Sequence, residues 1–160
     1  MQSVKSIAFA IAGIALIAGG YVFYRYSRLP DLANDSLATL LTLPPFYCTF
    51  GHGSFDAGGS GMVYVANGML RGREVEAGAL DGYMANQFID QSGNTYLWVD
   101  DKSKGVVIPA SAAALSVSFA DSLSADHTSF ASLCYPWWFP NSSYFSLPSD
   151  KTFATSSLAQ

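Results

Sequence analysis

An uncharged apolar run from Ile7 to Tyr24 constrains this chain more than any other feature. At 1.5 Å per residue, a helix of that length spans roughly 27 Å, close to the hydrocarbon thickness of a bilayer. Lys5 precedes the run, and Tyr24 and Tyr26 fall where interfacial aromatic residues are typical. The sequence therefore predicts a transmembrane signal anchor over residues 1–26.

A cleavable signal peptide is the alternative interpretation of the same run. Ala18-Gly19-Gly20 offers the small residues that a signal peptidase needs, behind an apolar segment of suitable length. The apolar run continues to Phe23, which favours the anchor. Lys5 on one side and Arg25 and Arg28 on the other nearly balance, so flanking charge does not decide the orientation.

The two cysteines, Cys48 and Cys134, bear on the compartment. They lie too far apart in sequence for a CxxC metal or redox motif. In a cytosolic protein two such residues would be buried thiols, whereas behind an export signal a structural disulfide is favoured. Closing so long a loop contributes about 4 kcal/mol in the chain-entropy model. We therefore expect a disulfide, and a domain on the periplasmic or extracellular side of the membrane.

Residues 27–45 are expected to form a stalk, which Pro44-Pro45 ends. An extracytoplasmic β-domain is expected over residues 46–153, followed by a frayed tail over residues 154–160. Alternating apolar residues and turn signals mark six consecutive strands, and Asn67-Gly68 is the strongest hairpin signal between them. The expected strands are residues 46–50, 62–66, 69–77, 83–90, 95–99 and 105–108.

Short links between these strands indicate a curved antiparallel β-meander, so the fold class is mainly β. Residues 109–133 break the rhythm and are expected to form a short helix or an irregular insertion, with residues 110–114 the most helix-prone. Residues 144–153 are expected to supply a closing strand.

The order of these elements resembles uncharacterised small bacterial membrane-anchored envelope proteins. The resemblance rests on the early cysteine, the glycine-rich turn, Gly61-Met62-Val63-Tyr64-Val65 and Cys134-Tyr135-Pro136-Trp137. More loosely, the meander resembles the half-barrel of outer-membrane lipoprotein carriers. This resemblance implies a half-barrel-like sheet whose concave face holds an acyl chain. It transfers no catalytic residue, and residues 109–133 and the doubled Trp137-Trp138 depart from the pattern.

Composition and motifs exclude several classes of function. A net charge of -4 argues against nucleic acid as a partner, because phosphate binding needs clustered basic residues. His52 and His127 lack a carboxylate cluster at ligand spacing, so neither a metal site nor a cofactor is expected. Asp100-Asp101 is more typical of a solvated turn than of a Ca²⁺ site. No Gly-x-Ser-x-Gly motif occurs, and we expect no enzymatic activity.

Trp137, Trp138 and Phe139 stand between two prolines and are candidates for a partner or ligand surface. Core packing beside the disulfide is the alternative. In an extended segment adjacent side chains point to opposite faces, so the two tryptophans cannot share one core.

Two functions are expected. The first is a membrane-anchored binding module, tethered through residues 7–24, for a lipid or other hydrophobic ligand on the concave face of the sheet. The second is a structural or interaction subunit of a cell-envelope or surface assembly, which the low charge content of 12% favours.

Overall fold

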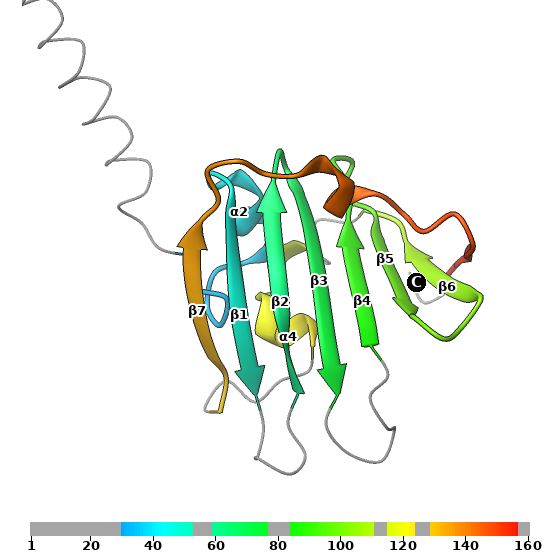
Figure 1. The fold of residues 1–160 in the computed structure, drawn as a ribbon, viewed down its shortest axis with the longest axis horizontal. Coiled ribbons are helices and arrows are strands. Elements are labelled where there is room, and N and C mark those ends of the chain that lie inside the picture. The colour runs from blue at the N-terminus through cyan, green and yellow to red at the C-terminus, as the bar shows by residue number, and fades with distance from the viewer. Residues whose placement is uncertain (1–29, 53–58, 77–83, 111–114, 124–128, 157–160) are drawn as a thin grey trace, which may run out of the picture.

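The computed structural model describes residues 30–52, 59–76, 84–110, 115–123 and 129–156. Their strands form one eight-stranded sheet (Figure 1). The elements, in chain order, are α2 (Leu37–Thr42), β1 (Phe46–His52), β2 (Gly59–Ala66), β3 (Met69–Glu76), β4 (Met84–Ile89), β5 (Thr95–Val99), β6 (Lys104–Ile108), α4 (Phe119–Ser122), β7 (Ala131–Pro136), the 3-10 helix η1 (Ser142–Phe145) and β8 (Thr152–Thr155).

The six strands expected from β1 to β6 are all present, and the expectation of a mainly β fold is confirmed. The hairpin at Asn67-Gly68 is confirmed as well. Both residues have positive φ, 54° and 72°, which is the backbone conformation that a two-residue hairpin turn requires. The turn sets the register of β2 against β3, in which Val65 lies opposite Leu70.

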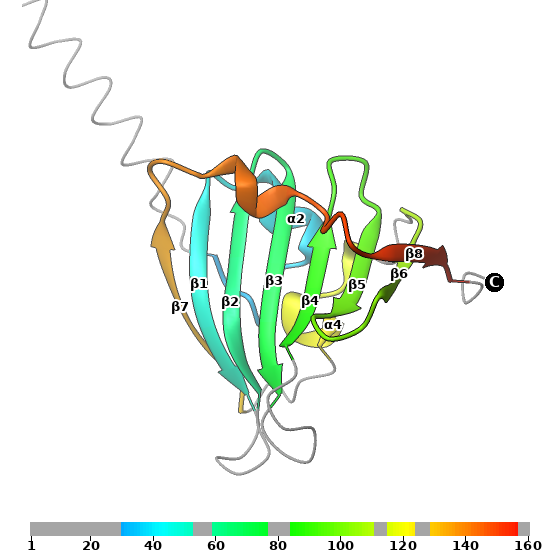
Figure 2. The ribbon, with the colours of Figure 1, turned by 45° about the vertical axis from the view of Figure 1, so that its right-hand side comes forward.

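The strand order is β7-β1-β2-β3-β4-β5-β6-β8, and the two edge strands do not pair with each other, so the sheet is open. The expectation of a purely antiparallel meander is wrong at one edge, because β8 runs parallel to β6. Lys151 explains this direction: its Nζ donates to the carbonyls of Asp100 and Lys102, at 2.8 Å each, in the turn that precedes β6. Strand β8 therefore begins at the same end as β6 (Figure 2).

Helices α2 and α4 lie behind the sheet in Figure 1, and we call the face that they cover the back face. Leu32, Leu37 and Leu40 come from the segment expected to be a stalk, yet all three are buried in the main core. Phe119 of α4 completes this layer against Phe50 of β1. Residues 30–45 are therefore packed onto the β-domain.

Hydrogen bonds at the N-termini of α2 and α4 connect the two helices on the back face. The Ser36 side chain caps α2, and Ser36 also forms an isolated bridge with Ser118, which caps α4 through a capping box with Asp121. Each cap satisfies backbone N–H groups that a short helix would otherwise leave unpaired. The two short helices thus support each other on the back face.

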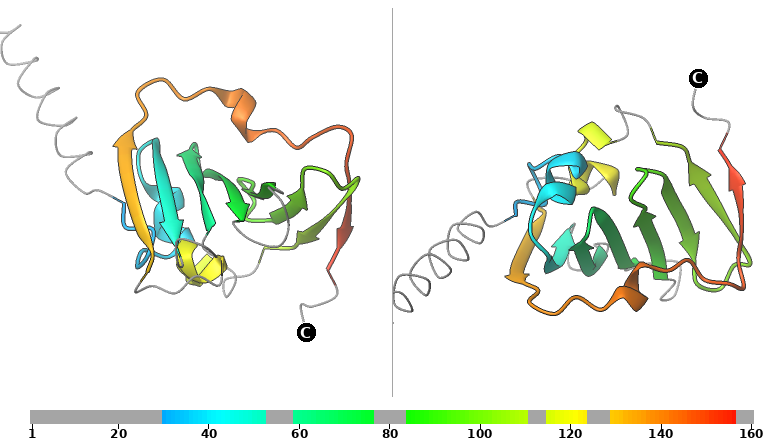
Figure 3. Two further views of the ribbon diagram at one scale, coloured as in Figure 1. Left: turned by 60° about the horizontal axis from the view of Figure 1, so that its bottom comes forward. Right: turned by 90° about the horizontal axis from the view of Figure 1, so that it is seen from above.

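The chain after β7 crosses the opposite face, which we call the front face. Figure 3 shows α2 and α4 on one side of the sheet and the η1 segment on the other. A second core cluster forms beneath this crossing from Ala66, Phe88, Trp98 and Phe145. Both faces of the sheet therefore carry packed side chains, but the front face is only partly covered.

The Cys48–Cys134 disulfide is present, and its Cα atoms lie 4.0 Å apart. Cys48 is opposite Cys134 in the antiparallel pairing of β1 with β7. Phe46, Cys48 and Phe50 share the back face and are all buried, as alternation along the strand predicts. The bridge joins the first strand of the sheet to a strand from the end of the chain.

Several expectations fall outside the described residues: the membrane segment at residues 7–24, His127, residues 111–114 of the helix-prone segment and the last four residues. Within residues 115–123, α4 is the short helix expected in the insertion. The closing strand expected over residues 144–153 is wrong in its bounds, because η1 ends at Phe145 and only Thr152–Thr155 form β8. Ala154 and Thr155 were therefore wrongly assigned to a frayed tail, and β7 begins at Ala131 within the expected insertion. Among the helices that the structure describes, none is long and apolar enough to cross a membrane.

Candidate functional site

The front face differs from the back face because side chains alternate along each strand. On β3, Leu70 and Gly72 point to the helix-covered back face, so Arg71 and Arg73 point to the front. On β2 and β4 the same alternation places Tyr64 and Phe88 beside Arg71. The front face therefore combines aromatic side chains with two arginines.

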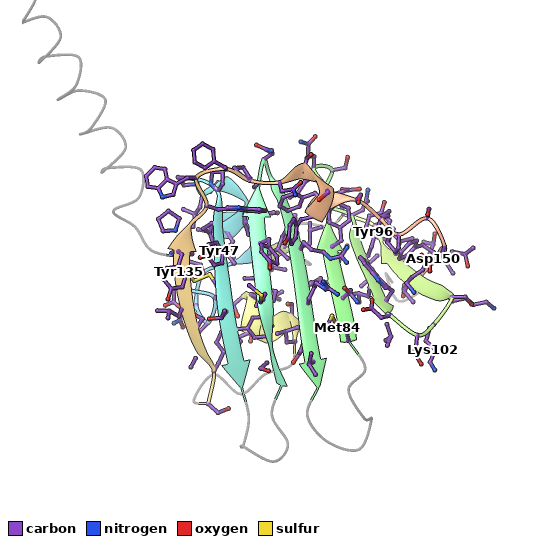
Figure 4. All side chains as sticks on the ribbon, viewed as in Figure 1. Tyr47, Met84, Tyr96, Lys102, Tyr135 and Asp150 are labelled. Carbon is purple, nitrogen blue, oxygen red and sulfur yellow. A yellow bond between two sulfur atoms is a disulfide. The ribbon has the colours of Figure 1, made fainter. Side chains whose placement is uncertain are left out.

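Tyrosines form a row across three neighbouring strands of this face. The ring centroids of Tyr135 and Tyr47 are 5.4 Å apart, and those of Tyr47 and Tyr64 are 6.4 Å apart. Figure 4 shows Tyr135 and Tyr47 together near one end of the sheet. Tyr144 of η1 packs on Tyr64 at 4.6 Å. Burial raises the pKa of Tyr64, and the neighbouring Tyr144 raises it further.

The three aromatic residues singled out in the sequence separate in the structure. Trp137 packs against Tyr64, with centroids 5.4 Å apart, and against Tyr144 at 5.6 Å. Trp138 is 58% exposed and Phe139 is 90% exposed. Trp137 is thus part of the front-face aromatic packing, while the two residues after it lie at the surface.

A polar cluster occupies the middle of the front face. The Arg71 guanidinium lies over the Trp98 ring and donates to Asn86 Oδ1 at 3.0 Å. Asn86 in turn donates to Asp100 Oδ1 at 2.8 Å, and Arg73 lies 3.6 Å from Asp100 Oδ2. Burial lowers the pKa of Arg71 to about 10, and the nearby charge of Arg73 acts in the same direction, although Asp100 opposes it.

The cluster leaves hydrogen-bonding capacity unused. Nε of Arg71 is buried and has no hydrogen-bond partner among the described residues. The two guanidinium groups of Arg71 and Arg73 face one carboxylate, that of Asp100, so the cluster carries a net positive charge. Such a cluster favours an anionic group in its neighbourhood.

Next to this cluster the front face is hollowed into a groove of ≈ 450 Å³. It lies over β1 to β4, beyond the part of the sheet that Trp137 and η1 cover. Met84, which is labelled in Figure 4, is the first residue of β4 and lies at the end of the sheet away from η1. We call this hollow the front groove; it is lined by Thr49, Phe50, Ser60, Gly61, Met62, Tyr64, Arg73, Val75 and Met84.

The back face offers much less room. The cavity beside α4 measures only ≈ 70 Å³, and Phe50, Phe119 and Leu123 are among the residues around it. Over β1 to β3, leucines from residues 30–45 fill the back face. A bound molecule of more than a few atoms therefore fits the front groove and not this cavity.

Among the described residues, the remaining sequence candidates do not gather into a site. Asp101 pairs with Lys102 at 2.8 Å, and Asp100 belongs to the arginine cluster. His52 is the last residue of β1. In the part of the chain that the structure describes, no three potential metal-ligating side chains come together.

Sequence reasoning did not single out Arg71, Arg73, Met62 or Met84 as site residues. Alternation on β3 was a usable signal, since Arg71 and Arg73 stand two apart and therefore share a face. The hollow beside them depends on where η1 stops, which no local pattern encodes. None of three comparisons, with protein-family models, curated proteins and solved structures, finds a match for this chain.

Proposed function

We propose that the chain is a membrane-anchored extracytoplasmic binding module that holds an amphipathic, anionic lipid-like molecule in the front groove. The observation that carries this proposal is the juxtaposition of Met62, Met84 and Val75 with Arg73 around one hollow of ≈ 450 Å³. That volume falls within the range typical of small-molecule sites. An apolar body and an acidic group are the two features that such walls recognise.

The apolar part of the ligand would lie against the methionines. Methionine side chains are unbranched and polarizable, so they adapt to flexible chains better than branched side chains do. Val75 is 39% exposed, which leaves apolar surface for the ligand to cover. Covering it would contribute about 25 cal/mol for each Å² removed from water.

The acidic part would pair with Arg73, whose side chain is 43% exposed at the groove. Arg73 now lies 3.6 Å from Asp100, and Asp100 also accepts a hydrogen bond from Asn86. A ligand carboxylate or phosphate would thus add a second anion to a cluster that holds two guanidinium groups. The planar guanidinium suits both acids, because it donates two parallel hydrogen bonds.

The proposed location rests on two separate features. The disulfide is compatible with an oxidising compartment outside the cytoplasm. The apolar run over residues 7–24 has the length of a membrane anchor. Together they favour a domain that works at the membrane surface, where amphipathic ligands are concentrated.

A methionine NMR titration tests the proposal. The full chain, labelled with ¹³C in the methionine methyl groups and placed in nanodiscs, is titrated with octyl phosphate and, separately, with octanol. We expect octyl phosphate to shift the Met62 and Met84 signals, and Met69, at the far end of β3, to serve as the internal reference. Octanol should bind more weakly because it lacks the anion.

Two variants test whether Arg73 is the residue that binds the phosphate. Arg73→Gln should weaken octyl phosphate binding to the level of octanol, whereas Lys104→Gln, which removes an exposed charge on β6, should leave it unchanged. Equal affinity for the two ligands in the unmodified protein would contradict the role of Arg73. Unshifted Met62 and Met84 signals would contradict the groove itself.

A second candidate function, a subunit of an envelope assembly, is favoured by Trp138 and Phe139. Both are large, apolar and more than half exposed. From Thr128 to Ser149 the sequence contains no Asp, Glu, Lys or Arg, so a partner would desolvate little charge there. Native mass spectrometry of the detergent-extracted protein tests this function, and a strictly monomeric species at all concentrations would count against it.

A further inference from the structure

Strand β7 forms one edge of the sheet and pairs only with β1 among the described strands. It is six residues long, and two of its large side chains remain exposed: Leu133 at 58% and Tyr135 at 42%. Unpaired edge strands are templates for another strand unless charge, proline or a covering segment protects them. Whether β7 can accept another strand depends on where its backbone N–H and C=O groups point.

The direction of the backbone groups on β7 follows from one hydrogen bond. Trp137 N donates to the carbonyl of Pro45 at 2.9 Å, next to the pairing of Pro136 with Phe46. In an antiparallel pair, residues alternate between those that bond to the partner strand and those whose N–H and C=O point away. Leu133 and Tyr135 consequently bond to β1, while the backbone groups of Ser132 and Cys134 point outward from the sheet.

The residues of β7 themselves carry little of the charge or proline that protects an edge strand. None of its six residues is charged, and its single proline, Pro136, stands at the end of the strand. The opposite edge strand, β8, is only four residues long and follows the charged pair Asp150-Lys151. Of the two edges of the sheet, β7 is the one suited to accept a strand.

We propose that β7 pairs with β7 of a second copy of this chain, antiparallel and centred on Leu133. In this register Ser132 of one copy lies opposite Cys134 of the other, and their outward N–H and C=O groups form four backbone hydrogen bonds around the two-fold axis. Leu133 meets its counterpart directly, and Tyr135 lies opposite the small Ala131. The axis runs perpendicular to the sheet, so both front grooves open on the same side.

A second copy fits this edge because of charge as well as register. The chain carries a net charge of -4, so two copies repel each other where their charged surfaces meet. The stretch from Thr128 to Ser149 contains no Asp, Glu, Lys or Arg, so it brings no like charges together. Six residues bury less than the roughly 1,200 Å² typical of stable interfaces, so the dimer is expected to be reversible and concentration-dependent.

Position 133 provides a direct test, because each copy contributes the same residue to the centre of the pairing. The full chain is extracted in detergent and its mass distribution is followed by native mass spectrometry against concentration. We expect the unmodified chain to form dimers. Leu133→Lys alone and Leu133→Asp alone should be monomeric, because each places like charges opposite each other, whereas their mixture should form the mixed dimer.

Two further variants control for other causes. Ser132→Pro removes one outward N–H donor and no bond to β1, so it should weaken dimers while leaving the Cys48–Cys134 bond intact. Val106→Lys introduces a charge at an equally apolar but distant position, 41% exposed on β6, and should dimerise like the unmodified chain. Each variant is checked for an unchanged circular dichroism spectrum.

A monomeric unmodified chain at every concentration would overturn the proposal. Dimers that persist in Leu133→Lys, or a failure of the Lys and Asp variants to form a mixed dimer, would also overturn it. The test is independent of the proposed ligand, since position 133 does not line the front groove and Arg73 does not lie on β7.

Discussion

The guanidinium carbon of Arg71 lies 4.2 Å from the centroid of the Trp98 ring. This contact joins β3 to β5 across the front face, and Asn86 on the intervening strand accepts a hydrogen bond from the same guanidinium. A cation over an indole face is stabilising by about 0.5 to 2 kcal/mol, depending on how far it is desolvated. The contact between Arg71 and Trp98 should therefore make a measurable contribution to the free energy of unfolding.

Replacing Arg71 should reveal this link. Arg71→Met is expected to lower the free energy of unfolding by about 1 kcal/mol and to change the emission of Trp98. Arg71→Lys keeps the charge but not the planar group, so it should restore only part of the stability. Urea unfolding followed by tryptophan fluorescence measures both variants. An unchanged unfolding midpoint for Arg71→Met would contradict a stabilising contact.

Loss of the disulfide should destabilise the domain markedly. Cys48→Ser/Cys134→Ser is expected to lower the free energy of unfolding by about 2 to 4 kcal/mol, because β7 would no longer be tied to β1 in the unfolded chain. Thermal unfolding with and without reductant measures the effect. The exposed Ser149→Ala serves as the control, and two free thiols in the denatured, never-reduced protein would refute the bridge.

Alanine substitutions at two glycines with positive φ distinguish the cost of backbone strain from the cost of side-chain crowding. Gly68 has φ 72° and nothing within 4 Å of an added Cβ, so Gly68→Ala should cost about 1 kcal/mol from conformation alone. Gly93 has φ 83°, and an added Cβ would lie 3.2 Å from Ala110 and Leu115. Gly93→Ala should therefore be more destabilising than Gly68→Ala in the same urea experiment. If Gly68→Ala were the more destabilising variant, Ala110 and Leu115 would have to move aside from the added Cβ at position 93 at little cost.

The turn after β4 depends on Asp90. Its carboxylate accepts hydrogen bonds from Ser92 N at 2.8 Å, from Asn94 N and Asn94 Nδ2 at 2.9 Å, and from the Tyr96 hydroxyl at 3.3 Å. Partial burial acts to raise the pKa of Asp90, but these hydrogen bonds outweigh it and the pKa lies below its usual value. Asp90→Ala should cost about 1 to 2 kcal/mol at neutral pH.

The sign of the pH dependence follows from this lowered pKa. The charged form is favoured in the folded protein, so the contribution of Asp90 is complete above the unfolded pKa of about 3.9 and is lost as the pH falls through the folded pKa. The stability difference between the unmodified chain and Asp90→Ala should therefore be constant near neutrality and shrink in acid. A difference that grows on acidification would contradict the assignment.

The membrane anchor is tested on the intact protein. If residues 7–24 form an uncleaved membrane helix, the mature chain keeps Met1 and stays with membranes through an alkaline wash. Intact-mass measurement of the purified protein decides this. A mature chain beginning at Tyr21 would show that the segment is a cleaved signal peptide instead.

Local sequence signals predicted much of the sheet. Asn67-Gly68 located a hairpin because both residues tolerate positive φ, and alternation along β1 placed Cys48 on the same buried face as its apolar neighbours. The Cys48–Cys134 bridge was also predictable, since the sequence contains two cysteines and these leave one pairing. These signals act over a few residues or through a single covalent partner.

The remaining features depend on contacts between distant segments. Leucines at 32, 37 and 40 were compatible with a stalk, but only the apolar back face of the sheet shows where they are buried. The direction of β8 was decided by Lys151 at the turn before β6, and the front groove by the point at which Trp137 and η1 stop covering the sheet. The sequence by itself determined strands β1 to β6, the buried face of β1 and the bridge, because propensity and alternation are local. Only the tertiary structure decided where β7 and β8 join the sheet and where the groove lies, because each depends on contacts between segments that are distant in the sequence.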